Sequence, residues 1–216
     1  MHASLPPADE FFTRARARLS LDVPVALTDP AAHSRRGDLD LDPSLWAQVG
    51  VSATKPAAVL IPVIERSEPM VLLTQRTAEL PSHPGQIAFP GGKIDREDAT
   101  PLAAALRETE EEIGLDRHFI DPIGYLDLYL TFSGFRILPA VARVAPDYSL
   151  TLNAREVVEA FEVPLTFLMT PANHQFLTRD WKGIQRQYYA MPYQQRYIWG
   201  VTAGILRNLY ERIFGG

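Results

Sequence analysis

The sequence predicts an α/β fold in which a mixed sheet lies between helices. Three observations support this class: apolar runs of strand length, an amphipathic helix with clear end signals, and strands interspersed with helices. Hydrophobic residues make up 46% and charged residues 22% of the 216 residues, which is the composition of a folded globular protein. We expect one domain over residues 51–216 and a partly helical N-terminal appendage over residues 1–50.

The expected strands are apolar runs bounded by turn-like residues. In chain order they cover residues 57–64, 70–75, 123–131, 135–144, 174–180 and 185–191. The charged and Pro-containing stretch 65–69 favours a reversal between the first two. The last two are expected to form a hairpin around Lys182 and Gly183 that continues the same sheet.

The best-defined helix is expected over residues 100–113. Thr100 fits the N-cap, Pro101 fits the first helical position and Gly114 fits the residue past the end. Less strongly marked patterns predict further helices over residues 9–21, 154–161 and 198–214. The first of these has apolar positions at Phe11, Phe12, Ala15 and Leu19.

Charge and composition exclude several classes of function. A net charge of -5 argues against a general nucleic-acid binder, because affinity for phosphate backbones comes from clustered Lys and Arg. The chain has no cysteine, which removes disulfides and thiol nucleophiles and favours the cytoplasm. No run approaches the roughly 20 apolar residues that span a bilayer, and the N-terminus lacks a secretory pattern, so we expect no membrane partner.

Acidic residues are concentrated in and before the helix over residues 100–113. Glu108, Glu111 and Glu112 share one face of that helix, because positions i, i+3 and i+4 are neighbours. Leu102, Leu106, Thr109 and Ile113 form the opposite stripe, which we expect to be buried. An isolated acidic run is more often a solvated face, but like charges at this spacing repel unless a cation neutralises them. Hard carboxylate oxygens suit Mg²⁺ or Mn²⁺.

A glycine pair lies shortly before the acidic helix. In Phe89-Pro90-Gly91-Gly92 the absence of Cβ atoms lets backbone N–H groups approach an anion. Gly-Gly alone is weak evidence, because most such pairs are turns. Together with the acidic helix it favours a site for a metal ion and a phosphate group.

The segment GGKIDREDATPLAAALRETEEEIGL resembles a Nudix box, GX5EX7REUXEEXGU with U apolar. The matching residues are Arg107, Glu108, Glu111, Glu112, Gly114 and Leu115. Thr109 replaces an apolar residue, Asp98 occupies the upstream acidic position, and the interval from Asp98 to Arg107 is one residue longer than usual. The resemblance implies a Nudix-like α/β/α sandwich that hydrolyses a diphosphate linkage with Mg²⁺ or Mn²⁺.

An overlapping segment resembles the coenzyme A pyrophosphatase branch of that family. LLTQRTAELPSHPGQIAFPGG is similar to LLTXR(S/A)X3RX3GX3FPGG, although Thr77 replaces a small residue and Pro81 stands where the pattern has Arg. The resemblance implies hydrolysis of coenzyme A to 3′,5′-ADP and 4′-phosphopantetheine. The alternatives are a pyrophosphatase for ADP-ribose, NADH or another nucleotide derivative, and a catalytically silent module that binds a nucleotide or a protein.

The resemblance also assigns roles to individual residues. Glu108, Glu111 and Glu112 would coordinate the metal, and Arg107 would orient this cluster. Substitution of Glu111 or Glu112 by Gln is expected to abolish turnover without affecting the fold, since both carboxylates are expected near the surface. The substrate's phosphates would be contacted by residues flanking or within the Gly-rich loop: Arg76, Gln86, Gly91 and Gly92.

Several other residues are left open by the sequence. Glu156 and Glu159, expected on a later helix, are second choices for the general base, and a surface role is favoured for each. His83 is expected to be a loop residue, and Tyr197 and Trp199 are expected in the core rather than against adenine. The expected partner is a small nucleotide derivative, and a homodimer is left open.

Overall fold

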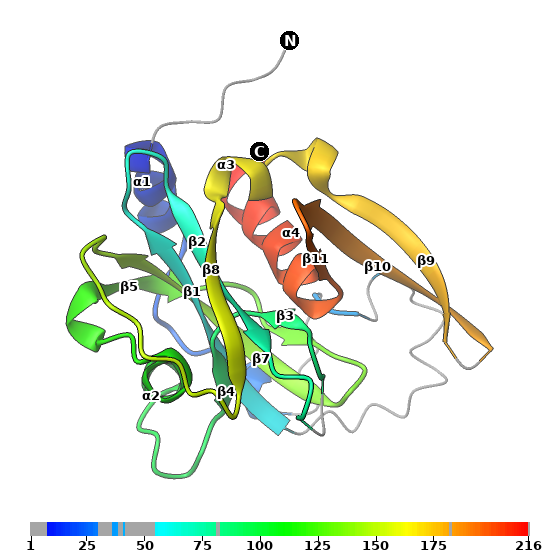
Figure 1. The fold of residues 1–216 in the computed structure, drawn as a ribbon, viewed down its shortest axis with the longest axis horizontal. Coiled ribbons are helices and arrows are strands. Elements are labelled where there is room, and N and C mark those ends of the chain that lie inside the picture. The colour runs from blue at the N-terminus through cyan, green and yellow to red at the C-terminus, as the bar shows by residue number, and fades with distance from the viewer. Residues whose placement is uncertain are drawn as a thin grey trace.

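The computed structural model describes residues 8–29, 36–38, 41, 55–80, 83–181 and 183–215, and these build two sheets with helices around them (Figure 1). The centre of the larger sheet is β1 (Lys55–Ile64), which pairs in parallel with β7 (Phe135–Val144) over its whole length. β1 also pairs antiparallel with β2 (Met70–Arg76) and β4 (Gly91–Lys93). The predicted mixed sheet is therefore confirmed.

The remaining strands of the larger sheet extend it on both sides of β1. β2 pairs with β3 (Ile87–Ala88) and β8 (Val157–Pro164), and β7 pairs with β5 (Ile120–Tyr125) and β6 (Tyr129–Leu130). The pairing of β1 with β2 confirms the predicted reversal at residues 65–69.

Helices cover both faces of the larger sheet. β1 is buried on both faces, as expected of a nearly continuous apolar strand. Leu60 packs on one face with Ala104 and Ala105 of α2 (Pro101–Ile113). On the opposite face Ile61 belongs to the core that includes α1 (Ala8–Arg18) and α4 (Val201–Phe214). The layers are thus helix, sheet, helix, which confirms the predicted α/β class with a mixed sheet between helices.

The first helix is an integral part of this core. Phe11 and Ala15 of α1 are fully buried, and the ring of Phe11 lies 6.3 Å from that of Phe214 on α4. The proposed domain boundary at residue 50 stays a prediction, because residues 42–54 lie outside the described ranges.

The predicted helix over residues 154–161 is wrong. Residues 154–156 form a turn, and β8 follows, with Val157, Phe161 and Val163 buried and Val158 exposed. This alternation and the pairing with β2 define an edge strand of the larger sheet, not a helix. The misreading arose because the short run EVVEAFEV fits both periods.

The predicted hairpin exists but belongs to a second sheet. β9 (Gln175–Trp181) pairs with β10 (Ile184–Tyr193), which pairs with β11 (Arg196–Trp199). Lys182, in the predicted turn, lies outside the described residues. The closing helix begins at Val201 rather than at residue 198, because β11 occupies residues 196–199 and Gly200 has a positive φ of 63°.

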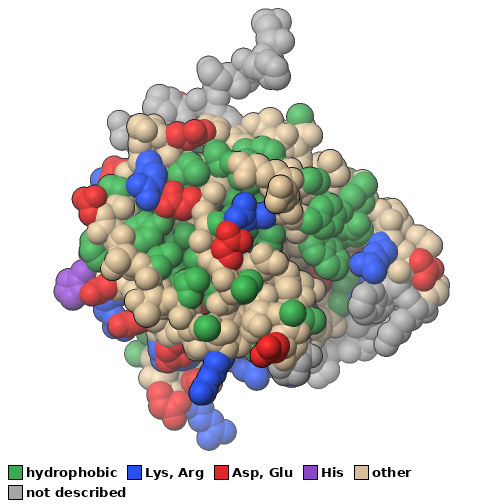
Figure 2. All heavy atoms as spheres, viewed as in Figure 1, with side chains coloured by type: hydrophobic (Ala, Val, Ile, Leu, Met, Phe, Trp, Pro, Cys, Tyr) green, Lys and Arg blue, Asp and Glu red, His purple; other side chains and the backbone are tan. Residues whose placement is uncertain are grey.

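Short helical segments complete the described chain: Val25–Leu27, Arg117–Phe119, α3 (Leu165–Leu168) and Pro171–Asn173. None of the helices in the described ranges is long and apolar enough to cross a membrane. On the face seen in Figure 2, hydrophobic side chains form several patches and charged side chains are scattered among them.

Candidate functional site

Both predicted end signals of α2 are present. The Thr100 side chain accepts a hydrogen bond from the Ala103 N–H at 3.0 Å, and Pro101 is the first helical residue. Gly114 adopts the left-handed conformation, with φ of 66°, and its N–H donates to the Glu110 carbonyl. These caps place the acidic turn of α2 beside β4, where the glycine pair lies.

Glu112 is the most deeply placed carboxylate of the helix. Only 4% of the residue is exposed, and its Oε2 accepts a hydrogen bond from the Gly91 N–H at 3.2 Å. Arg76 Nη1 lies 3.7 Å from its Oε1. Burial raises the pKa of Glu112 to about 7, although the Gly91 N–H and the charge of Arg76 oppose this shift.

Glu108 lies against the second glycine. A Cβ atom on Gly92 would come within 2.5 Å of the Glu108 carboxyl carbon, so glycine at this position leaves room for the carboxylate. The pKa of Glu108 is also raised, chiefly by burial, while the neighbouring Arg107 lowers it. The carboxylates of Glu108 and Glu112 thus both lie against the glycine pair of β4.

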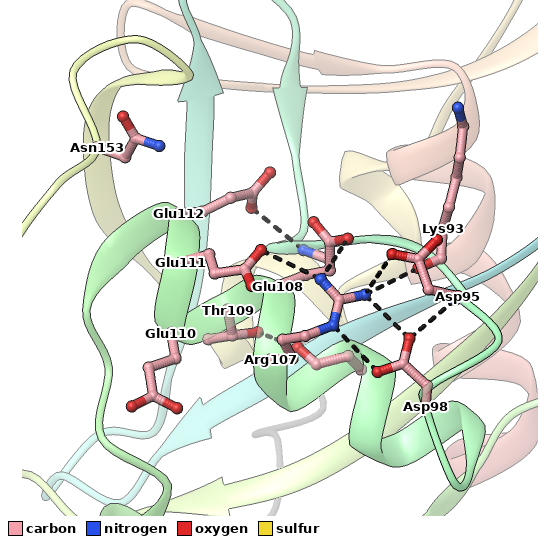
Figure 3. Close-up of polar contacts among 12 residues, drawn as sticks. Lys93, Asp95, Asp98, Arg107, Glu108, Thr109, Glu110, Glu111, Glu112 and Asn153 are labelled. Carbon is pink, nitrogen blue, oxygen red and sulfur yellow. Dashed lines mark hydrogen bonds and ion pairs between the residues drawn. The ribbon is translucent and has the colours of Figure 1, made fainter.

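Arg107 is the centre of an ion-pair network (Figure 3). Its guanidinium binds Asp98 in a bidentate manner, with Nε and Nη2 at 3.0 and 2.9 Å from the two carboxylate oxygens. Nη1 contacts Glu108 at 3.0 Å and Glu111 at 3.1 Å. Asp95 lies 3.6 Å away. Arg107 holds the pKa of Asp98 below its usual value.

The buried face of α2 differs from the face predicted from the sequence. The buried residues are Pro101, Ala104, Ala105, Thr109, Glu112 and Ile113, whereas Leu102 and Leu106 are only partly buried. Because the two alanines let α2 approach the sheet closely, Glu112 turns inward. The Glu111 side chain is 57% exposed. Glu112 therefore does not lie near the surface, and Glu111 occupies the outer edge of the site.

The carboxylates match a hard cation in donor chemistry. In the described part of the chain no three acidic or His side chains are already gathered around a common metal position. In this arrangement the positive charge beside Glu108 and Glu111 comes from Arg107. The buried Glu112 carboxylate, with its raised pKa, is a group that a divalent cation would stabilise in its charged form. The donor set therefore fits Mg²⁺ or Mn²⁺.

Three of the predicted phosphate-contacting residues, Arg76, Gly91 and Gly92, contact these carboxylates, whereas Gln86 contacts Arg76 and His83. Arg76 ends β2, and its N–H donates to the Gln86 carbonyl at 2.9 Å. The Gln86 side chain lies 3.1 Å from His83 Nδ1. His83 lies in a bend outside the strands and has a positive φ of 54°. Pro81 lies outside the described residues.

The two second choices for the general base differ in position. Within loop 151–156 the Asn153 N–H donates to the Glu112 carbonyl at 2.9 Å, and the Asn153 side chain donates to Glu156 at 3.1 Å. Burial is the main cause of the raised pKa values of Glu108 and Glu112, and the negative charge of Glu156 adds to both. Glu159 instead pairs with Arg196. Glu156 therefore borders the carboxylates.

Sequence reasoning missed Asn153 and Asp95 and misjudged Tyr197. Asn153 lies in a loop without a recognisable pattern, and Asp95 lies at a variable position of the segment that resembles the Nudix box, so neither was singled out. Tyr197 is 44% exposed on β11 and is not a core residue. The alternation of Arg196, Tyr197, Ile198 and Trp199 is a strand signal that could have separated exposed from buried positions.

Comparison with known proteins places this chain in a family. The model of the NUDIX domain matches residues 54–184. The uncharacterized Nudix hydrolase NudL of Escherichia coli strain K12 is 39% identical over 159 residues, covering 74% of this chain and 83% of the relative. The relative of the same name from Cronobacter sakazakii is 40% identical with the same coverage.

The solved structures that are similar include a Caenorhabditis elegans Ap4A hydrolase in a binary complex. It is 21% identical, with a TM-score of 0.43, over 50% of this chain and 80% of that one. The chain belongs to the Nudix hydrolase family and is an enzyme that acts on pyrophosphate bonds of nucleoside diphosphate derivatives. Members of this family generally use divalent metal ions such as Mg²⁺ or Mn²⁺.

Proposed function

We propose that this protein hydrolyses the diphosphate linkage of coenzyme A or its acyl derivatives, giving 3′,5′-ADP and 4′-phosphopantetheine or its acyl form. The observation that carries the proposal is the position of residues 72–92, which resemble the coenzyme A pyrophosphatase signature. Three residues of this segment contact the carboxylates: Arg76 lies 3.7 Å from Glu112, Gly91 donates to Glu112, and Gly92 lies against Glu108.

Glu108, Glu111 and Glu112 are the residues that would hold Mg²⁺ or Mn²⁺. When bound, a divalent cation neutralises charge on the diphosphate and lowers the pKa of a coordinated water. Arg107 holds the Glu108 and Glu111 side chains in place and is itself fixed by Asp98. It is a positioning residue, because its guanidinium is occupied by these carboxylates.

Arg76 and Gln86 are proposed to bind the diphosphate beside Gly91. The Arg76 side chain is 22% exposed, so its guanidinium is partly shielded from solvent. A shielded cation interacts more strongly with a phosphate than one in bulk water. Cationic contacts of this kind favour the charge that develops on the phosphoryl oxygens during hydrolysis.

Glu156 is proposed as the group that takes the proton of the attacking water. Asn153 fixes the orientation of its carboxylate, and loop 151–156 is attached to both α2 and β2 through hydrogen bonds. Water oxygen forms a bond to one phosphorus, the bridging P–O bond breaks, and the leaving phosphate keeps the bond's electron pair. The proton passes to the carboxylate and then to solvent.

Product analysis by mass spectrometry tests the substrate. The protein is incubated with Mg²⁺ or Mn²⁺ and a mixture of coenzyme A, acetyl-coenzyme A, NADH and ADP-ribose. We expect 3′,5′-ADP to form first, and Glu112→Gln to form none under the same conditions. Faster release of AMP from NADH or ADP-ribose would contradict the coenzyme A assignment, and absence of any product would support the silent binding module.

A further inference from the structure

One face of the small sheet carries three aromatic side chains in mutual contact. Ala190 pairs with Trp199 and Pro192 with Tyr197, so Tyr188, Tyr197 and Trp199 project from the same face. The rings of Tyr188 and Trp199 are 5.7 Å apart and those of Tyr197 and Trp199 are 6.5 Å apart. The two tyrosine hydroxyls share a hydrogen bond of 3.4 Å. We refer to these three residues as the aromatic cluster.

The aromatic cluster lies on the face of the small sheet opposite to the one that packs in the hydrophobic core. Met191 and Ile198 project from the opposite face, are fully buried, and belong to the core that includes α4. Tyr197 by contrast is 44% exposed. Tyr188 and Trp199 are half-buried, and none of the three rings belongs to the core that includes α4.

Positive charge flanks the aromatic cluster on the same face. Arg179 and Arg186 are directly opposite each other in the β9–β10 register, and Arg186 is two residues from Tyr188. The two guanidinium groups therefore bring positive charge to the face that carries the aromatic cluster. A hydrogen bond with Tyr188 and burial raise the pKa of Tyr197, and the nearby charge of Arg179 opposes that shift. Arg179 thus lies close to the cluster.

The aromatic face and the carboxylate site border one common segment, residues 83–88. Toward the carboxylate site, the Gln86 carbonyl accepts a hydrogen bond from the Arg76 N–H, and Arg76 contacts Glu112. Toward the small sheet, β3 contacts β11, and the Ile87 carbonyl accepts a hydrogen bond from Thr202 at the start of α4. In Figure 1, β3 is the part of the larger sheet that lies near β11 of the small sheet.

Arg186, on the face of the small sheet that carries the aromatic cluster, is also linked to His83 and Gln86 through a series of contacts. The Arg186 guanidinium lies 4.1 Å from the centre of the Phe132 ring. Asp38 accepts hydrogen bonds from the Phe132 N–H and the Tyr129 hydroxyl, and the charges of Arg186 and His83 act on its carboxylate. His83 in turn contacts Gln86. The small sheet is therefore positioned beside the proposed phosphate-binding residues.

We propose that the aromatic cluster and Arg179 bind the nucleoside half of the substrate, with the base stacked on Tyr197 and Trp199 and a ribose-linked phosphate beside Arg179. The inference rests on the proposed function and extends it to substrate selection. Aromatic rings bind any base through its π-face, whereas a guanidinium pairs with phosphate. The nucleoside half of coenzyme A carries a 3′-phosphate that ADP-ribose and NADH lack, so this surface would favour coenzyme A.

Calorimetric titration with 3′,5′-ADP tests the inference without turnover. We expect Tyr197→Ala to weaken binding about tenfold, the loss of one stacking contact. Phe176→Ala is the matched control: Phe176 is 50% exposed on the same sheet but projects from the opposite face, beside Tyr189. It should bind like wild type. Arg179→Gln should remove the preference for 3′,5′-ADP over 5′-AMP.

Steady-state kinetics with coenzyme A gives the second measurement. Tyr197→Ala should raise KM about tenfold and leave kcat within about twofold, because the cluster binds away from the reacting phosphorus. Unaltered 3′,5′-ADP affinity in Tyr197→Ala, or equal affinity of wild type for 3′,5′-ADP and 5′-AMP, would overturn the inference. Lack of coenzyme A turnover with intact 3′,5′-ADP binding would overturn the proposed function alone.

Discussion

The buried Glu112 carboxylate couples the stability of the chain to pH. Its pKa is about 7 in the folded state, against an ordinary value of 4.5, because burial disfavours the charged form. Between those two pH values the folded state holds a proton that the unfolded state has lost. Stability contributed by this group is therefore highest at acidic pH, falls as pH rises to about 7, and is constant above.

Glu112→Gln tests this coupling in the absence of divalent metal. The amide keeps the shape of the side chain and can still accept from the Gly91 N–H, but it cannot ionise. At pH 8 the free energy of unfolding of the variant should exceed that of wild type by about 3 kcal/mol. This difference corresponds to a pKa shift of about 2.5. At pH 4 the two should agree. Urea unfolding with EDTA at both pH values measures the difference, and equal stability at pH 8 would contradict the buried charge.

A second prediction at the residue scale separates Glu156 from Glu159. Glu156→Gln removes a carboxylate that borders Glu108 and Glu112, so kcat should fall by a factor of about 10² or more. Glu159→Gln is the matched control, because Glu159 pairs with Arg196 on β11. Its kcat should stay within about twofold. Equal losses in both variants would show that the effect is structural.

At the scale of elements, α2 could be predicted from sequence and its rotation could not. Thr100, Pro101 and Gly114 are local signals, so both ends of the helix were predicted correctly. Which face is buried depends on how closely α2 approaches β1 and β4, and the small side chains of Ala104 and Ala105 and the absence of a Cβ at Gly92 permit a close approach. The burial of Glu112 follows from this packing and not from helical periodicity alone.

The two glycines of β4 should respond differently to alanine. A Cβ on Gly92 meets the end of the flexible Glu108 side chain, which can move aside. Gly92→Ala should therefore change stability by less than about 1 kcal/mol while lowering turnover at least tenfold, because Glu108 is displaced. A Cβ on Gly91 meets the Ala58 carbonyl at 2.5 Å at a φ of 142°, so Gly91→Ala should lose about 1–3 kcal/mol of stability.

Thermal unfolding and coenzyme A turnover of the two variants provide the comparison. Gly92→Ala with wild-type turnover would show that the contact between Glu108 and Gly92 has no part in the site. Gly91→Ala with wild-type stability would show that β4 can shift away from β1 at no cost.

At the scale of the whole molecule, the sequence predicts the layers but not all the pairings. The apolar runs of β1, β2 and β7 mark them as strands, yet the parallel pairing of β1 with β7 joins segments about 80 residues apart and has no local signal. The same limit applies to the small sheet. The hairpin of the small sheet was predicted, but not that it forms a sheet of its own. That arrangement depends on long-range packing, in which Ile61 of the larger sheet and Met191 of the small sheet share one core with α4.

The N-terminal helix gives the last prediction, because residues 1–50 were expected to be an appendage. Phe11 is 1% exposed and packs among α4 and the larger sheet, so Phe11→Ala should lower the free energy of unfolding by about 3–5 kcal/mol. Val25→Ala is the control at a residue 73% exposed and should change it by less than about 0.5 kcal/mol.

Urea unfolding measures both variants, and kcat/KM is measured below the unfolding transition. The catalytic constants should be unchanged in Phe11→Ala, because α1 packs on the face of the sheet opposite α2 and its carboxylates. A loss of less than about 1 kcal/mol would show that α1 separates readily from the core. A loss of about 3–5 kcal/mol would mean that α1 folds together with the Nudix domain. Phe11 packs against Phe214 of α4, although α1 precedes residues 54–184, which match the NUDIX model.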